Sequence, residues 1–307
     1  MARKGRKLTK LAIGLITVLL AGGYGAVGYA YYQERATQDG AHTRIAELQS
    51  EKTSLEREIE ETEAQIVEKD AQIENLRNTN EQLPYSKDEY YRLCKQLEDK
   101  VLAGESPHKI AYLTFDDGPY TETTGQYLDV LEQYDVRATF FQLGKTSEKY
   151  DGLYRRAYEN GNTIANHTYS HQIKNGIYRG VDYFIADVVR NREFIENKLG
   201  YTTNILRFPG GTATAGSLYE GITQQLRELG YGWVDWNAAT GDGVVMLSPA
   251  EYRDNVLNDT KDRNVLVVLM HDYNRNTLVA LPEIIEGLRA QGYVLLPLFY
   301  ESAMVNK

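Results

Sequence analysis

The sequence predicts an α/β fold, a closed or nearly closed (β/α) barrel of about seven strands, preceded by a transmembrane helix and a coiled-coil stalk. From residue 109 onward, short apolar runs alternate with amphipathic stretches, the pattern of parallel strands joined by crossover helices. About seven such units in roughly 190 residues suit a barrel, with a doubly wound open sheet as the alternative. Before residue 109, an uncharged run and a heptad pattern indicate the two preceding helices.

The chain begins with a basic segment and continues with an uncharged one. Residues 1–10 carry five Lys or Arg side chains and no acid, and residues 11–30 carry no charge. Twenty helical residues span about 30 Å, the thickness of a bilayer core. We therefore expect a transmembrane anchor over residues 11–32, with the basic flank cytoplasmic and the rest of the chain extracellular. A cleaved signal peptide is the alternative, and it also leads to export.

Residues 41–83 show a heptad pattern. With Ile45 at position a, eight of the twelve a and d positions are Ile or Leu, which is typical of a parallel two-stranded coiled coil. We expect a homodimer through this stalk, with a single solvated helix as the alternative. Residues 84–108 are expected to form a helix and a linker, and residues 109–307 a globular domain.

Apolar and amphipathic periodicity gives the expected elements of the globular domain and of the helix before it. The expected strands are residues 110–115, 138–143, 163–165, 205–208, 232–236, 265–270 and 293–298. The expected helices are residues 88–101, 125–133, 150–159, 181–199, 218–229, 249–258 and 281–291. Because chemistry in such barrels belongs at the C-terminal ends of the strands, polar residues there are the candidate site.

Composition excludes several classes of function. The chain has 34 Lys and Arg against 43 Asp and Glu, a net charge of −9, which argues against a nucleic-acid partner. The single cysteine, Cys94, excludes an intrachain disulfide and a cysteine-rich zinc site. A mean hydropathy of −0.49 excludes a multi-spanning membrane protein, but not a single span.

Acidic and histidine residues follow three of the expected strands. Asp116 and Asp117 follow the first strand, in a sequence that is also a strong turn signal. His167 and His171 would lie one above the other on a helical turn and could share a metal, and His271 ends a later strand. One carboxylate and two histidines form a three-ligand set for zinc or another divalent first-row metal, and leave room for water and substrate. A second carboxylate beside them can act as a general base.

These residues resemble the polysaccharide deacetylases of carbohydrate esterase family 4, the group named for the nodulation chitooligosaccharide deacetylase. The resemblance covers about residues 109–298 and five motifs in the order of the family, namely Thr114–Pro119, His167–His171, Arg207–Gly211, Trp233–Asp242 and Leu269–His271. Gly210 and Gly243 stand where the family commonly has Tyr and Trp. These two differences leave the acid, base and metal residues in place, and bear only on the class of substrate.

The resemblance implies a distorted (β/α) barrel that removes acetyl groups from an N-acetylated sugar. It implies that Asp117, His167 and His171 hold the metal, which is zinc, or alternatively cobalt, nickel or manganese. Asp116 would be the base that takes a proton from water, and His271 the acid that protonates the leaving amine.

The resemblance also implies supporting roles. Arg207 would orient Asp116, Asp242 would orient His271, and the backbone N–H of Gly210 would help to bind the oxyanion. Leu269 and Trp236 would line a slot for the acetyl methyl group. Three tyrosines beside the motifs could stack on sugar rings, namely Tyr120, Tyr169 and Tyr273.

Topology and motifs together predict a membrane-anchored deacetylase that acts on a bacterial cell-wall polysaccharide. Peptidoglycan N-acetylglucosamine or a wall-linked N-acetylhexosamine glycan is the expected substrate. A catalytically silent carbohydrate-binding or scaffold protein of the envelope is the alternative, and an amidase or esterase of a non-sugar substrate is the enzymatic rival.

Overall fold

The computed structural model describes residues 22, 48–61, 87–260 and 263–307. The chain divides into two compact units, residues 1–84 and residues 85–307. The predicted anchor lies outside the described residues except at Gly22, and none of the helices that the structure describes is long and apolar enough to span a membrane. Of the predicted stalk, residues 48–61 are described and are helical, with ion pairs Lys52–Glu56 and Arg57–Glu61 at helical spacing.

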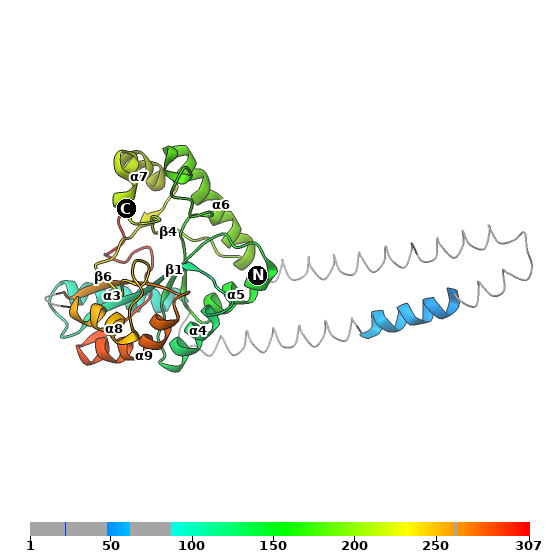
Figure 1. The fold of residues 1–307 in the computed structure, drawn as a ribbon, viewed down its shortest axis with the longest axis horizontal. Helices are drawn as coiled ribbons and strands as arrows, with labels where there is room; N and C mark the ends of the chain where they lie inside the picture. The colour runs from blue at the N-terminus through cyan, green and yellow to red at the C-terminus, as the bar shows by residue number, and fades with distance from the viewer. Residues whose placement is uncertain (1–21, 23–47, 62–86, 261–262) are drawn as a thin grey trace, which may run out of the picture. The chain divides into compact units, whose positions relative to one another are not determined.

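The second unit is built on one sheet whose strands pair in parallel (Figure 1). Its order is β5-β4-β3-β2-β1-β7-β6, and β8 also pairs with β1. The ranges are β1 (Lys109–Gly118), β2 (Thr139–Gln142), β3 (Thr163–Asn166), β4 (Ile205–Leu206), β5 (Gly232–Trp233), β6 (Ala238–Ala239), β7 (Val265–His271) and β8 (Tyr293–Leu295). Within the described residues β5 and β6 do not pair, so the barrel is distorted and open between them.

The described residues form eight strands, one more than the seven segments expected from the sequence. The additional strand is β6, and its two residues are too few to produce a periodic pattern. The sheet is otherwise the parallel one that the alternation of segments predicts, and its helices surround it (Figure 1).

The helices agree closely with the predicted ones, with one exception. The α-helices are α3 (Lys87–Leu102), α4 (Thr124–Gln133), α5 (Asp151–Glu159), α6 (Val181–Leu199), α7 (Tyr219–Glu228), α8 (Pro249–Asn258) and α9 (Arg275–Ala290), and short 3-10 helices cover Glu148–Tyr150, Ile177–Arg179 and Thr212–Leu218. The predicted start of α9 at residue 281 is wrong. The side chain of Asn274 accepts the N–H groups of Asn276 and Thr277 and starts the helix six residues earlier, which leaves Pro282 inside it.

Strand β1 lies between two layers of the core. Leu113 and Phe115 belong to the layer that packs with residues of α4, α8 and α9, while Ile110 and Tyr112 belong to the layer that contains Cys94 of α3. Alternate side chains of a strand point to opposite faces, so this division follows directly from the sequence of β1. Both faces of β1 are therefore buried, and the C-terminal end of the strand is held rigidly at the candidate site.

Candidate active site

A bulge at the end of β1 brings two neighbouring carboxylates to one place. Neighbouring side chains in a regular strand point to opposite faces, but the register of β1 against β2 shifts between Asp116 and Gly118, and Asp117 has a φ of 72°. Asp116 Oδ2 and Asp117 Oδ1 consequently lie 3.7 Å and 3.5 Å from the same atom, His167 Nε2. Both carboxylates of the first motif face one site.

Asp117, His167 and His171 form a cluster that can hold a metal ion. One potential ligand atom from each residue lies within 4.8 Å of the others, and His171 Nε2 is 3.3 Å from Asp117 Oδ1. The Nδ1 of His167 lies 2.9 Å from the carbonyl oxygen of Arg207, which can only accept, so Nδ1 donates and Nε2 offers its lone pair. Asp117 Oδ1 is buried and receives no hydrogen bond from any residue that the structure describes. The donor set and the free oxygen fit a divalent ion.

The electrostatics of this cluster also favour a cation. Burial raises the pKa of Asp117, but the three neighbouring imidazoles of His167, His171 and His271 outweigh it and hold the pKa well below its usual range. Burial lowers the pKa of His167, but Asp116 and Asp117 outweigh burial and raise it. The same negative carboxylates that attract a proton to His167 attract a metal cation.

The two histidines lie in a loop rather than on the predicted helical turn. Thr168 and His171 have φ values of 62° and 55°, and the segment is not helical. The side chain of Asn166 accepts the N–H of Thr168 at 2.8 Å, which closes a local turn that competes with helix formation. The imidazole rings are nevertheless 4.9 Å apart, so the predicted proximity is confirmed and the predicted geometry is wrong.

Arg207 fixes Asp116. The guanidinium of Arg207 is fully buried, and its Nη1 donates to Asp116 Oδ1 at 2.9 Å and to Thr114 Oγ1 at 2.7 Å. Its Nε donates to the carbonyl of Val234 at 3.2 Å, and the guanidinium carbon lies 4.2 Å from the ring centroid of Phe141. Since Oδ1 of Asp116 is bound by Arg207, Oδ2 remains on the side of His167 to exchange a proton.

His271 and Asp242 form a second, separate pair. The parallel register places His271 of β7 opposite Asp116 of β1. His271 Nδ1 donates to Asp242 Oδ1 at 2.7 Å, while Asp242 Oδ2 accepts the N–H of His271 at 3.0 Å and the hydroxyl of Thr277 at 2.7 Å. Burial lowers the pKa of His271, but Asp242 outweighs burial and raises it to about 9. His271 Nε2 lies 3.9 Å from Asp117 Oδ2, so a proton on Nε2 faces the cluster of Asp117, His167 and His171.

Comparison with known proteins shows what the chain as a whole is similar to. A family model described as polysaccharide deacetylase matches residues 103–233. A peptidoglycan-N-acetylglucosamine deacetylase of Bacillus cereus is 32% identical over 191 residues, which are 60% of this chain and 67% of the relative. The catalytic domain of peptidoglycan N-acetylglucosamine deacetylase from Eubacterium rectale superposes with a TM-score of 0.59 at 34% identity, over 66% of this chain and 94% of that one. The chain belongs to the polysaccharide deacetylase family. A Streptococcus mutans CE4 esterase is also similar, with a TM-score of 0.59, 30% identity and coverage of 66% and 90%.

The segment matched by the deacetylase family model ends at residue 233, before Asp242 and His271. The structure joins His271 to the matched part through the pairing of β7 with β1, and Asp242 through its hydrogen bonds to His271. It also places Leu269 two residues before His271 on β7, and therefore on the same face of the strand. The five motifs of this deacetylase thus meet at one end of the sheet.

Trp236 lies where the glycine-rich third motif leaves room. A Cβ atom on Gly211 would be 3.1 Å from the indole, and the guanidinium of Arg207 is 5.8 Å from the indole centroid. Trp236 is half-buried, so part of the indole remains available to a ligand. Gly210 has a φ of 75° and is exposed, and its carbonyl accepts the hydroxyl of Thr214.

An aromatic wall stands on the His271 side of the site. The ring of Tyr273 lies 5.2 Å from that of His271 and 5.4 Å from that of Tyr120, and both tyrosines are half-buried. Lys145 Nζ sits 3.3 Å from the ring centroid of Tyr120 and donates to the carbonyl of Pro119 at 2.8 Å. Tyr169 does not belong to this wall, because its ring packs against Phe194 and Arg190.

Sequence reasoning missed several residues that support the site. Thr114 and Thr277 contact Arg207 and Asp242 through hydroxyl groups, and no spacing rule marks them. Asp235 accepts the N–H of Thr212 at 3.1 Å and so anchors the glycine loop. Two further carboxylates were missed. Asp272 is adjacent to His271, and Asp187 lies on α6, the helix after the loop of His167 and His171.

Proposed function

We propose that this chain is a metal-dependent N-deacetylase of a cell-wall polysaccharide, either peptidoglycan N-acetylglucosamine or a wall-linked N-acetylhexosamine glycan. The relatives in Bacillus cereus and Eubacterium rectale carry the name of peptidoglycan N-acetylglucosamine deacetylase, which supports this substrate class. The observation on which the proposal chiefly rests is the meeting of a metal-ligand cluster with two separate proton-transfer groups. Asp116 contacts the cluster through His167, and His271 contacts it through Asp117.

Asp117, His167 and His171 would hold the ion. A carboxylate with two imidazoles is a set that zinc commonly takes, and cobalt, nickel or manganese are alternatives. A divalent ion bound there lowers the pKa of water and polarises a carbonyl oxygen. The free, buried Asp117 Oδ1 supports this assignment, because leaving such an atom unpaired is otherwise costly.

The protein groups then account for both proton transfers. Asp116 accepts the proton of the attacking water at Oδ2, because Arg207 binds its Oδ1. His271 donates the proton from Nε2 to the amide nitrogen as the bond between that nitrogen and the acetyl carbon breaks. The new bond joins the water oxygen to the acetyl carbon, so the products are acetate and a free amino sugar.

Other residues would hold the substrate. The backbone N–H of Gly210 would donate to the developing oxyanion. The indole of Trp236 and the side chain of Leu269 would line an apolar slot for the acetyl methyl group, and Tyr120 would pack on the face of a sugar ring. A catalytically silent binding or scaffold protein would need neither Asp116 nor His271, and the completeness of the set disfavours it.

The N-terminal segment would place this site at the wall. We propose a single-pass membrane anchor over residues 11–32, an extracellular catalytic domain over residues 109–307, and a stalk over residues 41–83 that pairs with a second copy. The basic flank, the uncharged run and the heptads of the sequence support this arrangement.

The decisive experiment measures metal content and acetate release together. The full chain, purified in a mild detergent and loaded with zinc, is given peptidoglycan fragments and, separately, chitooligosaccharides. We expect about one divalent ion per chain and acetate from at least one of the two glycans. A chain that binds the metal but releases no acetate from either glycan would refute the proposal.

A further inference from the structure

The loop that carries the two histidines is held from behind by one carboxylate of α6. Asp187 Oδ1 accepts the backbone N–H of Tyr169 at 2.8 Å, the backbone N–H of Ser170 at 2.8 Å and the hydroxyl of Ser170 at 3.2 Å. Tyr169 and Ser170 lie between His167 and His171 in the sequence. A single oxygen therefore binds three donors at the centre of the loop.

This loop needs an external support. It has no regular secondary structure, and Thr168 and His171 adopt positive φ values, which non-glycine residues rarely do and which cost free energy. Its internal hydrogen bonds lie at its two ends, where Thr168 donates to the Asn166 side chain and His171 donates to Thr168 Oγ1 at 3.2 Å. The middle of the loop is held from outside: Asp187 binds the N–H groups of Tyr169 and Ser170, and the N–H of Gly144 donates to the carbonyl of Tyr169 at 3.0 Å.

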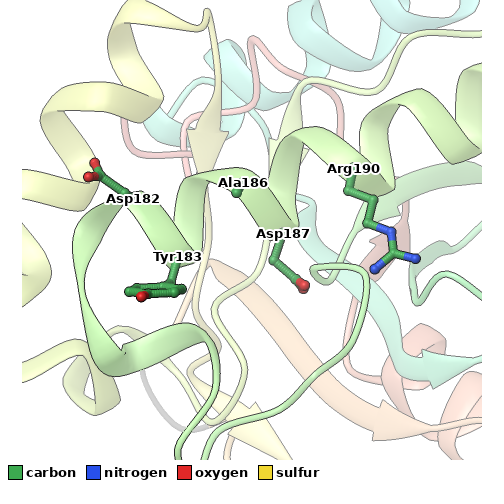
Figure 2. Close-up of a pocket in the computed structure, with 5 residues that line it drawn as sticks. All are labelled: Asp182, Tyr183, Ala186, Asp187 and Arg190. Carbon is green, nitrogen blue, oxygen red and sulfur yellow. The ribbon is translucent and has the colours of Figure 1, made fainter.

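Arg190 adds a second contact from the same side of α6. Residues three apart on a helix are neighbours on its surface, and Figure 2 shows Asp187 and Arg190 on one side of α6, where both line a surface pocket. The guanidinium carbon of Arg190 lies 3.6 Å from the ring centroid of Tyr169. Tyr169 is thereby held at its backbone by Asp187 and at its ring by Arg190.

We propose that Asp187 is a positioning residue for the metal site. It fixes the backbone from Tyr169 to Ser170, and so sets the direction of the His171 imidazole toward Asp117. Residues that orient metal ligands contribute strongly to affinity, although they do not touch the ion. The inference rests on the proposed function only in taking Asp117, His167 and His171 as the metal ligands.

The test measures metal affinity without any substrate. Zinc affinity is determined by competition with a chelator for the full wild-type chain, Asp187→Asn and Asp187→Ala, and the visible spectrum of the cobalt-loaded proteins is recorded. Asp182→Asn is the matched control, because Asp182 lines the same pocket but is exposed and, within the described part of the chain, makes no hydrogen bond or ion pair with the loop. Thermal melting of the metal-free proteins shows whether each variant is folded.

We expect zinc affinity to fall about 10- to 100-fold in Asp187→Ala, less in Asp187→Asn, and not at all in the control. The cobalt spectrum should change in the two Asp187 variants only. Should Asp187→Ala fail to fold, Asp187→Asn keeps the shape of the side chain and decides the matter. Unchanged affinity and spectrum in folded Asp187 variants would overturn this inference and leave the proposed function intact. If the Asp187 variants lose affinity but the wild-type protein deacetylates no glycan, the inference is supported and only the proposed function is refuted.

Discussion

The site contains two groups made of imidazole and carboxylate, and they differ in what lies on the far side of the imidazole. In the first, His167 Nδ1 donates to the backbone carbonyl of Arg207, and Nε2 faces Asp117. In the second, His271 Nδ1 donates to the carboxylate of Asp242, and Nε2 again faces Asp117, at 3.9 Å. Two histidines therefore face Asp117 from two directions.

The partner of Nδ1 distinguishes the two imidazoles, although carboxylates raise the pKa of both. A neutral carbonyl fixes the tautomer of His167 and leaves a lone pair for a metal ion. A carboxylate stabilises the charged imidazolium, and it raises the pKa of His271 to about 9 against the opposing effect of burial. The difference shows how one pocket can contain a metal ligand and a general acid built from identical side chains.

The largest expected effect comes from removing a ligand of the first group. His167→Gln should lose the bound metal and reduce deacetylation more than about 10³-fold, because both the ion and the site for water are lost. Metal content and acetate release are measured on the same preparation. Retained zinc in a folded His167→Gln protein would show that the carbonyl of Arg207 does not prepare a metal ligand.

Asp116→Asn separates the base from the ligands. Asp116 is held by Arg207 and does not belong to the three-ligand cluster, so the variant should keep its metal and lose activity by about 10²- to 10⁴-fold. Asp135→Asn, which changes an exposed carboxylate, is the control and should be fully active. Equal activity of Asp116→Asn and the wild type would mean that Asp116 is not the base.

The comparison also shows where sequence reasoning was sufficient for the fold. The helices α6 and α8 have the predicted boundaries, because a long amphipathic repeat specifies the first, and a capping box of Ser248 and Glu251 with Pro249 specifies the second. Strand β6 and the early start of α9 could not be predicted, since one is two residues long and the other depends on the side chain of Asn274.

For the site, residue types and motif order predicted which side chains would meet. They could not predict how, because the geometry depends on backbone conformation and on contacts between distant residues. The bulge at Asp117 turns two adjacent carboxylates to one side, and the carbonyl of Arg207 reaches His167 across forty positions of sequence. The support of the His loop by Asp187 depends likewise on the packing of α6, which no local pattern reveals.

Asp242→Asn sharpens the comparison by converting the second group toward the first. The amide still accepts a hydrogen bond but no longer stabilises a charge, so the pKa of His271 should fall. Because the acid works only while protonated, the alkaline decline of kcat should move to lower pH, and kcat should drop about 10- to 100-fold, with the metal retained. Thr277→Val, which removes a neutral donor to Asp242, should shift the decline less. An alkaline decline at the same pH in wild type and Asp242→Asn would exclude His271 as the titrating acid.

Among the described residues, Asp272 has no cationic partner in close contact, and substituting it is expected to give the smallest effect. It is fully buried, its Oδ2 accepts the hydroxyl of Thr124 at 2.5 Å, and its Oδ1 receives no hydrogen bond from the described residues. Burial therefore raises its pKa to about 7. Between the ordinary pKa of an aspartate, about 4, and this value, the folded protein holds a proton that the unfolded chain has released.

The sign of the effect on stability follows from this difference. Folding stability should decrease as the pH rises from about 4 to 7, since the folded state binds more protons there, and the loss should persist above pH 7. Asp272→Asn carries no such proton, so its free energy of unfolding in urea should exceed that of the wild type at pH 8 by about 1–3 kcal/mol and approach it at pH 5. The exposed substitution Asp182→Asn should follow the wild type at both values. A wild-type protein that is more stable than Asp272→Asn at pH 8 would show that Asp272 is ionised and has a cationic partner in the folded state. Asp272 would then resemble Asp116, which pairs with Arg207, and Asp242, which pairs with His271.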